Sequence, residues 1–330
     1  MFFRKAALAA LAAAAFTGAA GAADLPTKAA KPAAAPPPFF LVNDNSITYH
    51  YEFTATNPGA GRMPKNVLTY THFDVWQYGT NFFNVDWLRA NNGGRAFPFG
   101  HGTPAMPCDL TGAAGCQGYT EIYGFFRSTF GWNEIFNTKA FAVGPLQDIS
   151  FMVGADLNTD NTTLGSAKRS IEGGIRFSFS APYDGLINLT PNAYKEWQHD
   201  GFAATFGTNP SGNVDFRTTW GFEYLWVQPL GFLPPSIPLT FTAFGTVHGP
   251  KGSGEGVAQP PRTTEWYSQE NLSLDLGKVL GGRPGMLSTW VGYRYWYNKF
   301  GIDHSMSFAA NPASPFSIES TWLAGVTMAF

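Results

Sequence analysis

Apolar and polar residues alternate through most of the chain, in runs separated by clusters of Gly, Pro, Asn and Asp. The first run shows the pattern clearly, because Ile47 and Tyr49 fall on one face while Thr48 and His50 fall on the other. A period of two residues is typical of a β-strand with one apolar face. We therefore expect an all-β chain.

The pattern predicts about twelve strands, an even number that returns both termini to the periplasmic side of a membrane barrel. The expected strands are 45–55, 66–77, 81–88, 120–130, 147–158, 168–179, 186–198, 217–228, 238–248, 263–276, 286–299 and 319–330. A long connection follows every second strand, starting with the first. The long connections are 56–65, 89–119, 159–167, 199–216, 249–262 and 300–318. This alternation of long and short connections is expected of extracellular loops and periplasmic turns.

Composition decides between a soluble and a membrane barrel. Aromatic residues make up 16% of the chain and charged residues only 13%, with a mean hydropathy of -0.11. A soluble domain carries about 25% charged residues. A soluble lipocalin-like barrel would need fewer strands and a polar exterior. The sequence therefore favours a transmembrane antiparallel β-barrel, in which apolar residues face lipid and polar residues face the lumen.

The two ends of the chain carry signals for export and insertion. Arg4 and Lys5 precede an Ala/Leu-rich run that ends in small residues near Ala23, as expected of a signal peptide over 1–23. The run is too short for a transmembrane helix. We expect a Pro/Ala-rich periplasmic leader over 24–44 and the barrel over 45–330. The final strand, with apolar residues at every second position up to Phe330, resembles the signal read by barrel assembly machinery.

The remaining chemistry is sparse. Cys108 and Cys116 lie in the longest expected loop and are expected to form a disulfide in an oxidising compartment, with a metal site as the alternative. A formal net charge of -2 gives no reason to expect nucleic acid as a partner. The histidines sit in no nucleophile or metal motif, so neither an enzyme nor a cofactor is predicted.

Alternation also selects the side chains that should line the lumen and meet a solute. They are Tyr70, His72, Asp74, Phe82, Asp86, Glu121, Tyr123, Arg127, Glu172, Arg176, Tyr194, Glu223 and Arg294. Aromatic rings beside hydrogen-bonding groups suit a planar solute that stacks and is recognised at its edge. The alternative is that the charges fill the barrel and satisfy one another. Glu270 and Lys195 fall on the lipid-facing set, so each should lie beyond the membrane or beside a bulge.

Three segments resemble the Tsx-like family of nucleoside-specific outer-membrane channels. They are Leu68–Trp87, which contains TYTHFDVWQYGTNFFNVDW, then Phe141–Asp156, FAVGPLQDISFMVGAD, and Ala193–Gly201, AYKEWQHDG. The resemblance implies a monomeric twelve-stranded barrel that admits nucleosides through a narrow passage. It places His72 and Asp74 where the family has inward acidic groups, and His72 departs from an acid there.

Several functions stay open at this point. The first is passive uptake of nucleosides or similar small polar solutes across the outer membrane. The others are a structural or adhesive surface barrel with a plugged lumen, and a less selective small-solute porin. A barrel enzyme at the lipid boundary would need a Ser, His and Asp or Asn set, which the sequence does not indicate.

The expected topology can be tested by thiol labelling of intact cells. In a background without Cys108 and Cys116, Pro210→Cys and Ser253→Cys should react with an impermeant reagent, because both lie in expected extracellular loops. Asp184→Cys should stay unlabelled, because it lies in an expected periplasmic turn. Labelling of the Asp184 variant would show that the barrel has the opposite orientation or that the expected strands are wrong.

Overall fold

The structure is a computed structural model, which describes residues 38–57, 61–90, 119–160, 167–199, 209–254, 260–307, 310–311 and 314–330. Its main strands are β1 (Phe40–Asn57), β2 (Gly61–Trp76), β3 (Gly79–Ala90), β4 (Tyr119–Gly131), β5 (Leu146–Asp160), β6 (Arg169–Ala181), β7 (Gly185–His199), β9 (Thr219–Pro229), β10 (Leu239–His248), β11 (Glu265–Asp275), β12 (Leu287–Tyr297) and β13 (Glu319–Ala329).

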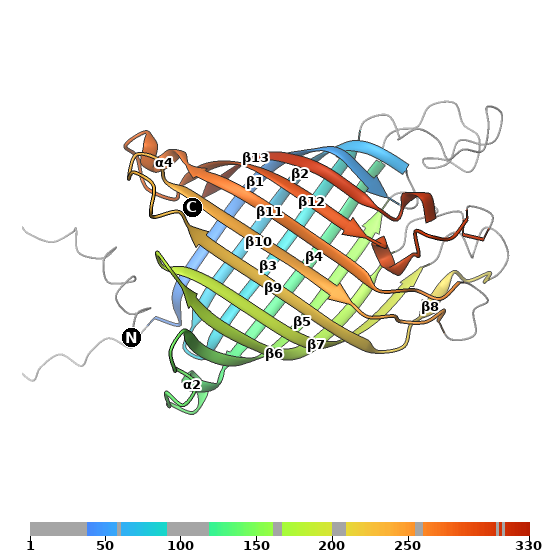
Figure 1. Ribbon diagram of the computed structural model, residues 1–330, viewed down its shortest axis with the longest axis horizontal. Helices are drawn as coiled ribbons and strands as arrows, with labels where there is room; N and C mark the ends of the chain where they lie inside the picture. Colours follow the sequence, from blue (N-terminus) through green and yellow to red (C-terminus); the bar gives the residue numbers. More distant parts are fainter. Residues whose placement is uncertain are drawn as a thin grey trace, which may run out of the picture.

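These strands form one closed antiparallel barrel (Figure 1). Each long strand pairs with its sequence neighbours, β1 pairs with β13, and β6 pairs with β7. A thirteenth strand, β8 (Asn213–Asp215), pairs with the end of β7 beyond the point where β9 leaves it. The expected fold, an all-β barrel of twelve antiparallel strands, is confirmed, with one short strand added.

The two ends of the barrel differ. The start of β1 and the end of β13 lie at one end, together with the short helices α2 (Trp132–Ile135) and α4 (Leu276–Val279) (Figure 1). We call this the terminal end and the opposite one the loop end. Connections at the loop end include the short 3-10 helices η1 (Lys299–Gly301) and η2 (Ser314–Phe316). Among the described residues, the helices are too short to cross a membrane.

The outer face of the barrel is apolar, as the alternation requires. On β13, Trp322, Val326 and Met328 point outward with exposed fractions of 63%, 45% and 51%, whereas Leu323 is buried. Large exposed apolar side chains recur on the other strands, among them Ile47, Tyr49, Phe53, Trp87, Ile122, Phe126, Phe151, Val153, Leu157, Ile171, Trp220, Trp226, Trp266, Leu272 and Val291. A surface of this kind is suited to hydrocarbon.

The first hairpin is longer than expected. The sequence predicts a loop over 56–65, but β1 continues to Asn57 and β2 begins at Gly61. A β-bulge between Glu52 and Ala55 lets the pairing resume at Ala55 with Met63, and both side chains are buried. β1 also begins at Phe40, so residues 40–44 belong to the strand rather than to the leader. Cys108 and Cys116 lie outside the described residues.

A polar group on the outer face of β13 should impair insertion. Met328→Asp should lower the amount of heat-modifiable barrel in the outer membrane at least about twofold, because a carboxylate there faces lipid. Ser288→Asp is the matched control, since Ser288 lies at the same level on β12 but on the inner face. Equal loss in both variants, read by gel shift without boiling, would refute the assigned faces.

Candidate functional site

The lumen is the candidate site, because most of the predicted solute-facing residues point into it. These are Phe82, Asp86, Glu121, Tyr123, Arg127, Glu172, Arg176, Tyr194, Glu223 and Arg294. Their positions follow from strand alternation: Glu121, Phe125 and Arg127 share one face of β4, and Tyr123 lies between them on that face.

Three predicted lumen residues lie on the outer face instead. Tyr70 is 39% exposed, and its hydroxyl donates to Asn45 Oδ1 at 2.8 Å. His72 and Asp74 share its face of β2, whereas Thr69 is on the inner face and donates to Asp86 Oδ1 at 2.7 Å. Phe73 pairs with the inward Phe82. The expectation that Tyr70, His72 and Asp74 line the lumen is therefore wrong.

The misplaced residues form a polar network on the outside. His72 Nδ1 lies 2.9 Å from Asn45 Oδ1, and His72 Nε2 lies 3.1 Å from Asp74 Oδ2. Asn81 Nδ2 donates to Asp74 Oδ1 at 2.9 Å, and Ser128 Oγ donates to Asn81 Oδ1 at 2.7 Å. We call these five residues the outer polar network. Its members satisfy one another, which lowers the energetic cost of placing them on an otherwise apolar surface.

Arg127 is the centre of a cluster of ion pairs in the lumen. Its Nη2 donates to Glu223 Oε1 at 2.6 Å, and its Nη1 donates to Asp156 Oδ1 at 2.9 Å. It also pairs with Glu172. These four side chains form the Arg127 cluster, and they come from β4, β5, β6 and β9. Because β4 and β9 are not neighbours in the barrel, the bond from Arg127 to Glu223 crosses the lumen.

Two neighbours shape the position of Arg127. Its guanidinium carbon lies 3.9 Å from the centroid of the Phe125 ring, a cation–π contact. Gly154 leaves the space on the other side, because an added Cβ there would lie 2.6 Å from Arg127 Cδ. A side chain at residue 154 would displace the guanidinium from its carboxylates.

A second set of ion pairs lies at the loop end of the lumen. Lys251 donates to Glu196 Oε2 at 2.5 Å, and Lys299 donates to Glu319 Oε2 at 2.9 Å. Lys65 donates to Glu121 Oε2 at 3.0 Å. Lys251 follows β10 and Lys299 belongs to η1, so segments outside the strands reach into the mouth of the barrel. Both lysines are buried.

Sequence reasoning can find the carboxylates of the loop-end pairs but misses the lysines. Glu196 and Glu319 lie on the inner faces of their strands, where alternation can find them. Lys251 and Lys299 lie outside the strands, and no periodicity marks them. Tyr194 was predicted, and the structure adds its partners: its hydroxyl donates to Glu196 Oε2 at 2.6 Å, and its ring stacks on His248 at 3.7 Å.

Beside the Arg127 cluster, the inner faces of β3 and β4 are aromatic and polar, with Phe82 in register with Arg127. The Phe82 and Phe125 rings meet edge to face with centroids 5.6 Å apart. Asn84 Nδ2 donates to Asp86 Oδ1 at 2.9 Å, beside Thr69. This part of the wall offers ring faces next to carboxylate and amide groups. Within the described part of the chain, no cluster of His, Cys, Asp or Glu could hold a metal ion.

Lys195 and Glu270, which fitted the lipid-facing set badly, do point outward. Lys195 lies near the loop end of β7, where it pairs with Asp215 of β8 and with the carbonyl of Phe216. Its ammonium also lies 5.4 Å from the Trp197 ring centroid. The added strand β8 therefore supplies the counter-charge. Glu270 pairs in register with Ala243 and Tyr293 at the middle of β11, without a bulge.

Comparisons with known proteins show similarity of fold but no similarity of sequence that would define a family. No family model and no curated protein matches the chain. An outer membrane channel from Pseudomonas putida F1 is similar over 90% of this chain and 100% of its own, with 10% identity and a TM-score of 0.46. Pseudomonas aeruginosa OccK11 (OpdR) is similar over 87% and 95%, with 11% identity and a TM-score of 0.35. The β domain of the Bordetella autotransporter BrkA is similar over 87% and 98%, with 8% identity and a TM-score of 0.36.

The class of the protein follows from its own geometry. A closed ladder with an apolar outer face and a charged lumen is a transmembrane β-barrel, because closure leaves no unpaired strand edge in the hydrocarbon. Barrels of this kind belong to outer membranes. The chain is an outer-membrane β-barrel, as the sequence predicts.

Removing Arg127 should change both selectivity and stability. Arg127→Ala leaves Asp156, Glu172 and Glu223 facing one another, so the preference for cations should rise and thermal stability should fall. Breaking a buried pair in this way costs about 3–5 kcal/mol. Arg176→Gln is the control, because Arg176 is an inward cation near Glu223 and Glu172 that forms no ion pair with a described residue, so the charge is lost without a pair being broken. Reversal potentials in a salt gradient and heat-modifiability midpoints measure the two effects. Equal shifts in both variants would contradict the central role of Arg127.

Proposed function

We propose that the barrel is a passive outer-membrane channel for small polar solutes, with nucleosides as the first class to test. The loop end faces the cell exterior and the terminal end faces the periplasm, in line with the longer connections at the loop end. The protein works as a monomer and is inserted by the barrel assembly machinery. The observation that carries the proposal is the mixed aromatic and charged wall of a lumen enclosed by twelve strands.

The aromatic part of the wall supports a planar solute. Phe82 and Phe125 meet edge to face, and because Arg127 lies against the Phe125 ring we expect a base to stack on Phe82. Asn84 and Asp86 lie on the inner face of the same strand as Phe82. Stacking on a protein aromatic contributes about 1–3 kcal/mol per base. A binding free energy in that range is enough to make solute flux saturable. A bound solute then occupies the channel and slows the passage of ions.

The charged part of the wall supports selectivity over free diffusion. The Arg127 cluster places one cation among three carboxylates, and its members satisfy one another across the lumen. A solute with hydrogen-bonding edges can exchange its bonds to water for bonds to this cluster. An apolar solute of the same size would displace water from the cluster without replacing its hydrogen bonds. The cluster therefore favours hydroxyl- and amide-bearing solutes.

A second candidate is a closed structural or adhesive barrel. It is favoured by the same bonds, because Arg127 to Glu223 joins β4 and β9 across part of the lumen and Lys251 to Glu196 fixes a connection in the mouth. In that case the loops would carry the function and no solute would pass. Ion current separates the two candidates directly.

The test is block of single-channel current by nucleosides in planar bilayers. Wild-type barrels should conduct, and adenosine at millimolar concentration should reduce the current. Phe82→Ala should weaken this block about tenfold, because it removes a stacking face. Phe83→Ala is the matched control: it is the next residue, but it lies on the outer face and is 38% exposed.

Each other outcome points elsewhere. Absence of any current in the wild type would refute the channel and favour the structural barrel. Current that neither adenosine nor thymidine reduces would refute the nucleoside assignment and leave a less selective small-solute porin. Equal effects of Phe82→Ala and Phe83→Ala would remove Phe82 from the solute path.

A further inference from the structure

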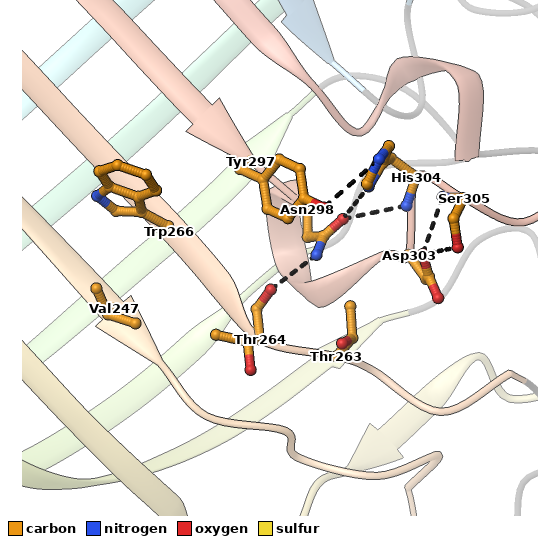
Figure 2. Close-up of a pocket in the computed structure, with 9 residues that line it drawn as sticks. All are labelled: Val247, Thr263, Thr264, Trp266, Tyr297, Asn298, Asp303, His304 and Ser305. Atoms are coloured by element: carbon orange, nitrogen blue, oxygen red, sulfur yellow. Dashed lines mark hydrogen bonds between the residues drawn. The ribbon is translucent and has the colours of Figure 1, made fainter.

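A concave site lies outside the lumen, at the loop-end rim of β10, β11 and β12. Figure 2 shows it between Trp266 and Val247 on one side and Tyr297, His304 and Asp303 on the other. Its volume is about 440 Å³, within the range of small-molecule sites in proteins. No step of the proposed solute path uses these residues.

The pocket opens on the outer face of the barrel. Trp266 is 45% exposed, and its register partner on β12 is Tyr297, so the two aromatic side chains project from the same face. Val247 is paired with Trp266 on the other side and shares that face. Because β10 ends at His248 and β12 ends at Tyr297, the site lies where these strands end, at the loop end of the barrel.

The loop that completes the pocket is held in one conformation by Asn298. This residue is buried and adopts a left-handed backbone with φ of 52°. Its Nδ2 donates to the carbonyl of Thr264 at 2.9 Å, and its Oδ1 accepts from the backbone N–H of His304 at 3.1 Å. His304 Nδ1 lies 2.9 Å from the same oxygen. The imidazole is thereby fixed, with its ring centroid 4.5 Å from that of Tyr297.

Asp303 supplies a carboxylate at the opening. Its Oδ1 accepts from the Ser305 N–H at 2.9 Å and from the Ser305 hydroxyl at 2.6 Å. These two bonds lower the pKa of Asp303 below its ordinary value, so the group stays ionised near neutral pH. Its second oxygen, and the hydroxyls of Thr263 and Thr264, make no hydrogen bond to any residue that the structure describes. These groups are available to a ligand.

The arrangement combines two aromatic side chains with a border of hydroxyl, carboxylate and imidazole groups. A sugar ring has the complementary chemistry, because its C–H face packs on an aromatic ring while its hydroxyls form hydrogen bonds around the edge. A purely apolar ligand would leave the carboxylate and hydroxyls without partners. Asp303 repels phosphate and carboxylate groups, so the uncharged sugar residues of a glycan are expected in the pocket and its anionic groups outside it.

We propose that this rim pocket binds a saccharide. The site is independent of solute passage and can exist in a channel or in a closed barrel. Two sources offer the same chemistry: the sugar head group of a glycolipid in the adjacent leaflet, and a free oligosaccharide from outside. The pocket lies at the loop-end border of the apolar face, so both sources have access to it.

The test measures binding to the full barrel in detergent by calorimetry and by saturation-transfer NMR. The probes are rough-type lipopolysaccharide, its lipid-free core oligosaccharide, and D-glucosamine. The variants are Trp266→Ala and Asp303→Asn, with Trp322→Ala as the control, because Trp322 is an exposed aromatic of the same outer face but does not line the pocket. Heat-modifiability confirms that each variant is folded.

The wild type should bind the lipid-free oligosaccharide, and Trp266→Ala should weaken that binding about tenfold, as is common when a central aromatic anchor is truncated. Trp322→Ala should leave it unchanged. Tighter binding of the lipopolysaccharide, lost in Trp266→Ala alone, would assign the glycolipid as the source. Binding of the lipopolysaccharide alone, weakened equally by Trp266→Ala and Trp322→Ala, would show adsorption to the aromatic face and overturn the proposal. So would the absence of binding to all three probes.

Discussion

The structure depends on one constraint, which is that every backbone polar group in the spanning strands must find a partner within the barrel. Hydrocarbon offers no water to an unpaired N–H or C=O. The pairing of β6 with β7 and of β1 with β13 meets this requirement, because it gives each long strand two neighbours. Once the ladder is closed, alternation sends successive side chains to lipid and to the lumen. The apolar outer face and the charged interior are two consequences of the same pairing.

The interior then has to manage the charge that alternation places there. Charged groups enclosed by a protein wall are costly unless they are paired and hydrogen-bonded. The Arg127 cluster achieves this with partners from separate strands, and the loop-end pairs do so partly with lysines from the connections. Such pairs also narrow the passage, because long side chains extend across it. The proposed selectivity would follow from this pairing, since a solute in the channel would have to compete with bonds that are already formed.

Much of the barrel could be predicted from the sequence, because lipid enforces a strict alternation. The strand expected at 217–228 is observed as Thr219–Pro229, and its inward Glu223 and outward Trp226 are as expected. On β2 the polarity rule failed. Val67 and Phe73 lie on the inner face, while Tyr70 and His72 are satisfied by Asn45 on the outer face. Polarity alone could not choose between the two registers there.

The candidate site was less predictable than the strands, for a different reason. Lys251 and Lys299 reach the lumen from connections, where side-chain direction depends on tertiary contacts. The length of the first hairpin was missed because a bulge after Glu52 changes the count of residues between buried positions. Neither signal is carried by a local period of two.

The outer polar network has a consequence for the surrounding bilayer. The network lies near the terminal end of β1 to β4. On β7, the outward-facing charge of Lys195 lies near the loop end instead. The hydrophobic height of the barrel is therefore uneven around its circumference. Lipids match the apolar height of the protein they surround, at a cost of fractions of a kcal/mol per Å of mismatch. We expect the membrane to thin beside the outer polar network, or the barrel axis to lean away from the bilayer normal.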